Sequence, residues 1–199
     1  MRSTPSTTRA WPCAPLLICW KWRISDLRPL TSDLHLTMFG PDKGDGSLDQ
    51  VKSEVRRLNF GGCISLPGFV SKTQVPTVLN SGDIFLNTTN VDNTPVSVIE
   101  AMACGLCIVN TKAGGLPYLV DDEQDGLLVQ PNDAKAMAAA VGRILREPGL
   151  AERLSRNARA KAEQFDWSVI LPRWEQLLRG VAQAAKGRPP RAKSRETSR

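Results

Sequence analysis

Between residues 34 and 129 the chain repeats one pattern, in which a short apolar run is followed by a segment with helical spacing or by a turn. The apolar runs are four to six residues long, which suits strands that are buried on both faces. Such runs in alternation with helices are typical of βα units and predict a parallel sheet. We therefore expect an α/β domain that binds its ligands beyond the carboxyl ends of the strands.

The expected elements follow one another in regular order. Apolar runs predict strands at residues 34–39, 63–66, 83–89, 107–111 and 126–129. Helical spacing and helix-start residues predict helices at residues 48–58, 76–79, 95–104 and 116–120. Beyond Pro131 the chain is expected to be helical throughout, at 134–145, at 149–165 and from 166 past 178, where Pro172 should bend or restart the helix.

The two ends of the chain differ from its middle. Residues 1 to about 25 hold three of the five tryptophans and show no periodicity, so we expect residues 1–33 to be a divergent leader, disordered or not native to the domain. A nucleotide-binding domain with C-terminal helices is expected at residues 34–183. Residues 184–199 are expected to be a basic, disordered tail.

The charge of the chain is concentrated in this tail. Its net charge is +6, and the last fourteen residues hold six basic residues and one acidic residue. Such a tail could touch an anionic membrane surface or RNA, although a solvated tail is the simpler interpretation. We expect no nucleic acid partner, and we allow a peripheral membrane contact.

The cysteines indicate a reducing compartment and no disulfide framework or metal site. They are five in number and show no disulfide spacing, which fits a reduced, cytoplasmic protein. Cys104 and Cys107 form a CxxC pair, but the single histidine, His35, lies far away in the sequence. We therefore expect no metal site and interpret both cysteines as buried packing residues. No apolar run approaches the roughly 18 residues that a membrane span needs.

The loop at residues 90–94 has the composition of an anion site, because it joins an expected strand to an expected helix. Thr94 can cap this helix, and Pro95 suits its first position. The N–H groups of Val96 and Ser97 are then free, and with the helix dipole they form a site for a phosphate or a diphosphate.

Two carboxylates accompany this helix start. Asp92 lies in the loop, and Glu100 lies about two turns into the helix. A carboxylate in the loop can accept from a sugar hydroxyl beside the phosphate, and one on the helix can accept from two hydroxyls of a ribose. The residues alone favour equally a structural interpretation, in which Asp92 forms the turn and Glu100 pairs within the fold.

An ordered set of motifs resembles the family 4 retaining glycosyltransferases. That family carries an E-x7-E motif that continues as EAMA-x-G, followed by a strand and a T-x-x-GG turn. Here seven residues separate Asp92 from Glu100, residues 100–105 read EAMACG, and Thr111 is followed by Gly114-Gly115. Further matches to the family lie at residues 39–41, 68–70, 125–129, 131–133 and 165–167.

The resemblance implies a Rossmann-like α/β domain, the C-terminal half of a GT-B fold, truncated at its N-terminal edge. It implies transfer of a hexosyl group from a nucleoside diphosphate sugar to a carbohydrate or lipid-linked acceptor, with retention of configuration and without a metal or another cofactor. Glu100 would bind the donor ribose and Asp92 would contact the sugar hydroxyls. The sugar and diphosphate would be lined by Thr94, Pro95, Val96 and Ser97, and the nucleobase by Gly68, Phe69 and Val70.

The chain departs from the family at two points. Asp92 stands where the family has a glutamate, one methylene longer. The family also clamps the diphosphate with an arginine and a lysine that follow the first strand, whereas Arg23 and Arg28 lack that context. Because the acceptor-binding N-terminal domain is also missing, we expect little or no transferase activity from this chain. The alternatives are a non-catalytic nucleotide-sugar-binding module, which could complement a separate N-terminal half, and an inactive product of a truncated gene.

Overall fold

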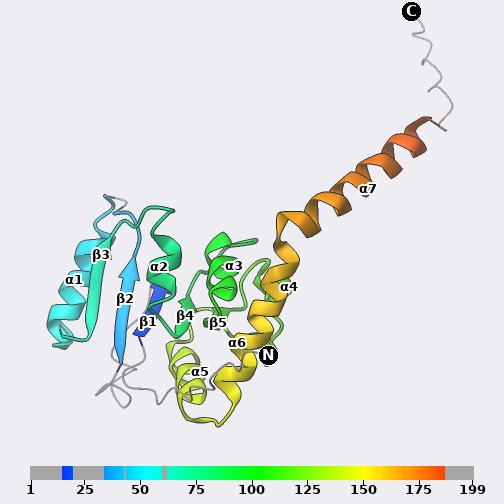
Figure 1. Cartoon of the computed structure of the whole chain (residues 1–199). Coiled ribbons are helices and arrows are strands. Elements are labelled where there is room, and N and C mark those ends of the chain that lie inside the picture. The colour runs from blue at the N-terminus through cyan, green and yellow to red at the C-terminus, as the bar shows by residue number, and fades with distance from the viewer. Residues whose placement is uncertain (1–14, 20–33, 43, 60–61, 187–199) are drawn as a thin grey trace, which may run out of the picture. The chain divides into compact units, whose positions relative to one another are not determined.

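A computed structural model of the chain describes residues 15–19, 34–42, 44–59 and 62–186 (Figure 1). For residues 15–19 the description is limited to the backbone. The expected leader and tail therefore lie largely outside the described residues, and the expected domain boundaries remain a prediction.

The core of the first unit, residues 1–163, is a six-stranded sheet in which every pair of neighbours is parallel. The strands lie in the order β3-β2-β1-β4-β5-β6. They are β1 (Pro15–Cys19), β2 (His35–Phe39), β3 (Ile64–Gly68), β4 (Ile84–Asn87), β5 (Cys107–Thr111) and β6 (Leu127–Val129). The order reverses between β1 and β4, and a crevice forms at such a point beyond the carboxyl ends of the strands. The expected parallel α/β sheet is confirmed.

Helices follow the strands as the spacing predicts. In the first unit they are α1 (Ser47–Leu58), α2 (Val75–Leu79), α3 (Val96–Ala103), α4 (Leu116–Leu119), α5 (Ala134–Arg146) and α6 (Leu150–Ala162). A 3-10 turn, η2 (Glu163–Phe165), ends the helix that we expected to run from 149 to 165.

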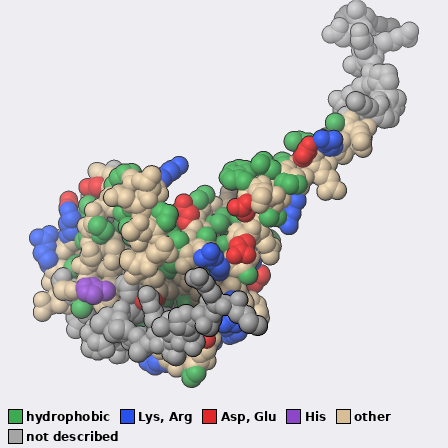
Figure 2. All heavy atoms as spheres, viewed as in Figure 1, with side chains coloured by type: hydrophobic (Ala, Val, Ile, Leu, Met, Phe, Trp, Pro, Cys, Tyr) green, Lys and Arg blue, Asp and Glu red, His purple; other side chains and the backbone are tan. Residues whose placement is uncertain are grey.

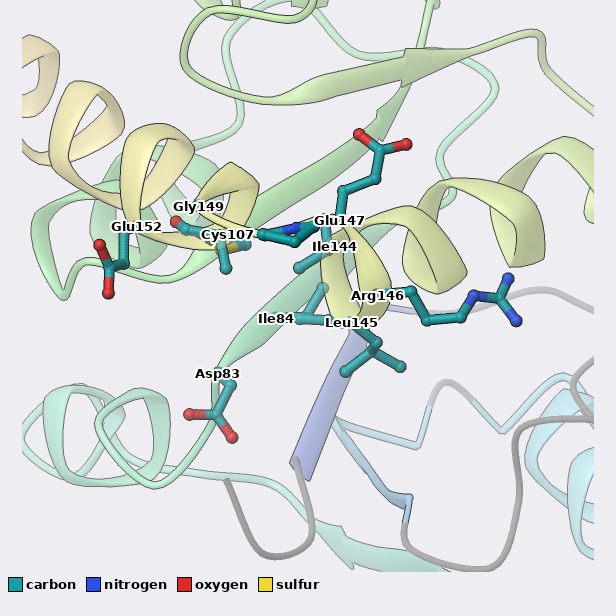
Figure 3. Close-up of a pocket in the computed structure, with 11 residues that line it drawn as sticks. Asp83, Ile84, Cys107, Ile144, Leu145, Arg146, Glu147, Gly149 and Glu152 are labelled. Carbon is teal, nitrogen blue, oxygen red and sulfur yellow. Dashed lines mark hydrogen bonds between the residues drawn. The ribbon is translucent and has the colours of Figure 1, made fainter. Parts of the chain in front are cut away.

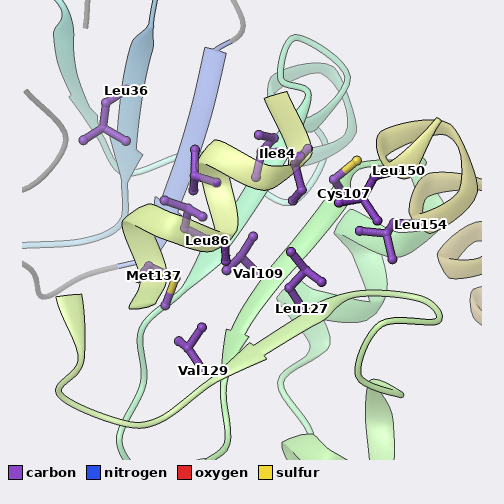
Figure 4. Packing of buried hydrophobic residues seen from close by; sticks show 13 residues of the cluster. Leu36, Ile84, Leu86, Cys107, Val109, Leu127, Val129, Met137, Leu150 and Leu154 are labelled. Carbon is purple, nitrogen blue, oxygen red and sulfur yellow. The ribbon is translucent and has the colours of Figure 1, made fainter. Parts of the chain in front are cut away.

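The neighbouring strands β4 and β5 bury every one of their side chains. Ile84, Leu86 and Cys107 belong to a core cluster that packs against α5 and the beginning of α6 (Figure 4). Phe85 and Ile108 point the opposite way, into a second cluster with α2, α3, α4 and the end of α6. Burial on both faces explains why these strands are continuous apolar runs in the sequence.

β1 lies within the segment for which we expected a leader and no element. Its backbone pairs with β2 on one side and β4 on the other, so it occupies the centre of the sheet. The sequence there offers only a short apolar run, Leu16-Leu17-Ile18, next to tryptophans and prolines. A buried strand of this length has no periodicity of its own, and the run was therefore not recognised.

The second unit, residues 164–199, contains α7 (Trp167–Lys186). Pro172 lies inside this helix, so of the two predicted effects, a bend or a restart, the restart is wrong and the bend stays a prediction. Large apolar side chains are exposed along α7, and Figure 2 shows them as green spheres on this helix. Among the described residues, no helix is both long enough and apolar enough to cross a membrane.

Candidate functional site

A cavity of about 530 Å³ lies at the carboxyl ends of β2, β3 and β4. It is lined by the loop that follows β2, by one side of α1, by the end of β3 and by the loop between β4 and α3. This is the edge of the sheet at which doubly wound parallel sheets bind ligands.

The floor of the cavity depends on two glycine-bearing strand ends. Gly40, just after β2, donates its N–H to the carbonyl of Gly68 at 2.9 Å and so joins the ends of β2 and β3. Gly68 has φ 82°, a left-handed conformation that glycine adopts without steric cost. Both residues line the cavity, as does Phe39.

The loop between β4 and α3 is held against the turn that follows β5. Gly115 donates its N–H to the carbonyl of Asp92 at 2.9 Å. A Cβ on Gly114 would lie 1.9 Å from the Asp92 carbonyl oxygen, and a Cβ on Gly115 would lie 1.9 Å from the Asn93 carbonyl oxygen. The glycine pair is therefore required for this close packing, which fixes the position of Asp92 at the cavity.

α3 begins one residue later than expected. Pro95 occupies the N-cap position with φ −67° and ψ 118°, and no side chain caps the helix, so the prediction that Thr94 caps it is wrong. A proline ring pre-sets the backbone for the helix start without a side-chain acceptor. The helix hydrogen bonds begin at Val98, whose N–H donates to the Pro95 carbonyl at 3.1 Å. Val96 and Ser97 come before Val98 in the first turn, so their N–H groups have no helical acceptor and stay available to a ligand.

Four of the predicted site residues line the same cavity: Gly68, Asp92, Pro95 and Ser97. The other predicted residues are not part of the lining. Phe69 and Val96 are 73% and 64% exposed, and Thr94 and Glu100 are also exposed. Glu100 lies three residues after Ser97, on the same side of α3. Val70 is half-buried outside the lining.

The charged side chains of the lining come from three elements. Asp42 accepts a hydrogen bond from the Gly44 N–H at 2.9 Å and so shapes the loop after β2. Lys52 of α1 lies 3.9 Å from the exposed Asp49, a weak ion pair that leaves the ammonium group able to contact an anion. Together with Asp92, these residues give the cavity both acceptors and a cation.

Sequence reasoning missed a polar residue at the base of the cavity. Asn87 ends β4, is 4% exposed and lines the cavity. Its Oδ1 accepts from the Thr89 N–H at 3.3 Å, whereas its Nδ2 has no partner. An amide at the carboxyl end of an otherwise apolar strand is the signal that would have pointed to it.

A second cavity, of about 230 Å³, lies at the opposite, amino end of β4 and β5 (Figure 3). Asp83, Glu147 and Glu152 contribute carboxylates to its lining. Cys107 also borders it, and burial followed by the nearby Asp83 carboxylate raises the pKa of its thiol to about 12. Among the described residues, no group of three histidine, cysteine or acidic side chains could hold a metal ion.

Comparison with known proteins shows the family of the chain. Residues 24–161 match the family model described as glycosyl transferases group 1. Over 90 residues, 45% of the chain, the sequence is 37% identical to the D-inositol 3-phosphate glycosyltransferase of Saccharomonospora viridis. That match spans 21% of the relative's own length.

Solved structures share the fold. The Anabaena protein HepE in complex with UDP superimposes with a TM-score of 0.77 at 20% identity, covering 85% of this chain and 49% of HepE. The C-terminal domain of the group 1 glycosyl transferase LpcC from Francisella tularensis superimposes with a TM-score of 0.66 at 17% identity, covering 76% of this chain and 85% of that domain. The described fold is thus the Rossmann-like fold of GT-B glycosyltransferases. On the strength of the family match, the chain belongs to the group 1 glycosyl transferases.

Proposed function

We propose that the cavity at the carboxyl ends of β2, β3 and β4 binds a nucleoside diphosphate sugar, and that the chain is the donor-binding half of a family 4 retaining glycosyltransferase. The observation that carries this proposal is the convergence of Gly68, Asp92, Pro95 and Ser97 on one cavity at the beginning of α3. A volume of about 530 Å³ lies within the range of roughly 300–1,000 Å³ typical of small-molecule sites. HepE, whose fold is similar, was crystallised with UDP.

The diphosphate is assigned to the start of α3. The N–H groups of Val96 and Ser97 donate to its oxygens, and the positive end of the helix dipole stabilises its charge. Because the charge on the leaving nucleotide grows in the transition state, these fixed donors favour cleavage of the sugar–phosphate bond. Lys52, on the facing side of the lining, supplies a positive charge to the same cavity.

The carboxylates are assigned to the hydroxyl groups of the donor. Asp92 lines the cavity next to the helix start and accepts from the hydroxyls of a hexosyl group. Glu100 shares the side of α3 that carries Ser97, and its long side chain accepts from the ribose at the rim of the cavity. Gly68, Phe69 and Val70 border the base, and the exposed ring of Phe69 offers a surface for stacking.

Transfer to a carbohydrate or lipid-linked acceptor needs parts that the described residues do not supply. The chain spans about half the length of HepE. In family 4 an arginine and a lysine that follow the first strand clamp the diphosphate. β1 directly precedes residues 20–33, so the expectation that Arg23 and Arg28 follow no strand is wrong, but those residues lie outside the described ones. That the chain alone has little or no transferase activity stays a prediction. A separately encoded partner half, a purely nucleotide-sugar-binding role and the product of a truncated gene remain the alternatives. Cys63, Cys104 and Cys107 are free thiols, which supports a cytoplasmic location.

Calorimetry of the full chain with a panel of UDP-, GDP- and ADP-sugars tests this function. We expect the sugars of one nucleobase to bind. We also expect no turnover of a labelled donor when simple acceptors are added. Absence of heat with every member of the panel would contradict the donor site. Turnover above about 1 s⁻¹, an ordinary enzyme rate, would contradict the inactivity of the chain alone.

A further inference from the structure

Two neighbouring asparagines hold the buried polar side-chain atoms that lack a partner in the described part of the chain. These atoms are Nδ2 of Asn87 and both Nδ2 and Oδ1 of Asn110. The two residues are register partners on β4 and β5, so their side chains leave the same face of the sheet. Buried polar groups are normally hydrogen-bonded, and an unpartnered one costs folding free energy, so each requires an explanation.

The face that carries the two asparagines is the one that α3 covers. Phe85 and Ile108 precede them by two residues on the same strands, and both belong to the core cluster that includes α3. Asn87 therefore lies beneath α3, where Ser97 borders the same cavity. Asn110 is 0% exposed and is not part of the cavity lining.

The orientation of the Asn87 amide leaves a donor for the cavity. Its Oδ1 is occupied by the Thr89 N–H at 3.3 Å, and its Nδ2 is the end without a partner. The Oδ1 already accepts one hydrogen bond, so the two N–H groups of Nδ2 are the part of the amide that needs a partner. The N–H groups at the start of α3 are also donors, so the ligand group that fits between them carries several acceptor oxygens and a negative charge.

We propose that Asn87 is a ligand-binding residue whose side-chain amide donates a hydrogen bond to a phosphate oxygen of the bound nucleoside diphosphate. This inference rests on the proposed function of the cavity and adds to it a contact that the motif around Asp92 and Glu100 does not contain. A phosphate oxygen would give Nδ2 of Asn87 the partner that the protein does not supply. A neutral amide is also less costly to bury than a lysine or an arginine.

Asn87→Leu tests the contact, and Asn110→Leu is the matched control. Each substitution replaces a buried amide that has at least one unpartnered atom by an apolar side chain of similar size at the same register level, but only Asn87 borders the cavity. Asn110→Leu removes only unpartnered atoms and should leave the melting temperature unchanged or raised. Asn87→Leu also removes the acceptor of the Thr89 N–H, so its melting temperature is measured alongside the binding and is expected to fall slightly. In calorimetry with UDP and with inorganic pyrophosphate, we expect Asn87→Leu to weaken binding about tenfold and Asn110→Leu to leave it unchanged.

The possible results separate this inference from the proposed function. If the wild-type chain binds UDP and both variants bind it equally well, or lose it equally, the Asn87 contact is refuted and the donor site stands. If pyrophosphate binds through Asn87 but no nucleotide binds, the phosphate contact stands and the proposed function fails. If neither probe binds to the wild-type chain, both are refuted.

Discussion

Cys107 shows how burial removes chemistry from a residue that looks reactive in the sequence. It begins β5, is 2% exposed and donates from its Sγ to the Ala151 carbonyl at 3.4 Å. Burial, and then the nearby Asp83 carboxylate, raises the pKa of its thiol from 9.0 to about 12. Burial also raises the pKa of Cys104, and its environment is therefore equally unsuited to a reactive thiolate. Cys107 is a buried packing residue as predicted, whereas Cys104 is half-buried and packs against the edge of the second core cluster.

The raised pKa of Cys107 has a consequence for stability. Above pH 9.0 the thiol ionises in the unfolded chain but stays protonated in the folded one. Ionisation lowers the free energy of the unfolded state alone, so the free energy of unfolding falls. The stabilisation is complete below pH 9 and is lost as the pH rises toward 12. We expect the free energy of unfolding of the wild-type chain to fall by about 1.4 kcal/mol more than that of Cys107→Ala between pH 8 and pH 10. Denaturant titrations at the two pH values measure it, and parallel changes in both proteins would contradict it.

The sequence predicted part of the site at the level of single residues. Asp92, Pro95 and Ser97 were predicted because a helix start after a strand has a recognisable composition. The capping role of Thr94 was wrong because Pro95, rather than a side-chain oxygen, occupies the N-cap. Asn87 was missed because its importance depends on which face of β4 it occupies and on the missing partner of its amide, and neither is visible in the sequence.

At the level of elements, the site depends on contact between two loops that follow the neighbouring strands β4 and β5 at the carboxyl edge of the sheet. The turn that follows β5 touches the loop that follows β4 through Gly114 and Gly115, with backbone atoms where their side chains would be. This contact aligns the loop that carries Asp92 with the beginning of α3. It gives a physical role to the glycine pair of the motif, Gly114-Gly115, which the sequence showed only as a pattern.

Gly115→Ala tests this contact. Gly115 has an ordinary φ of −85°, so strain in the substituted backbone does not arise, and the effect comes from the Asn93 carbonyl oxygen 1.9 Å from the new Cβ. We expect a loss of stability of about 1–3 kcal/mol together with weaker nucleotide binding. Gly62→Ala is the control, because a Cβ there meets nothing within 4 Å. Equal melting temperatures for the two variants would refute the role of the contact.

Strands with a clear apolar run in the sequence were predicted, and a strand without such a run was missed. β4 and β5 are buried on both faces and stood out as apolar runs between helices. β1 was missed because five residues beside tryptophans and prolines carry no period. α7 continues through Pro172, since a proline six residues into a helix removes one backbone hydrogen bond without preventing the following turns.

At the level of the whole molecule, the order of the strands decides where a ligand binds. The strand order reverses between β1 and β4, and a crevice forms beyond the carboxyl ends of the strands at such a point. The cavity of about 530 Å³ lies there, at the ends of β2, β3 and β4. Sequence alternation predicted a parallel sheet, but the strand order depends on long-range pairing that alternation does not encode. The C-terminal domain of LpcC, whose fold is similar, was crystallised by itself.

The diphosphate of a nucleotide sugar should lie against the first turn of α3, and one pair of variants at Ser97 tests this most directly. Ser97 lines the cavity. Aspartate and asparagine have nearly the same size and differ in charge, so Ser97→Asn is the matched control for Ser97→Asp. An aspartate in the first turn is favourable to the helix, so the charged variant should fold.

Calorimetry of Ser97→Asp and Ser97→Asn with the nucleotide sugar that binds the wild-type chain is the decisive measurement. We expect the carboxylate of Ser97→Asp to repel the diphosphate, so that this variant binds at least tenfold more weakly than Ser97→Asn, a difference of about 1.4 kcal/mol or more. Equal affinities for the two variants would contradict it.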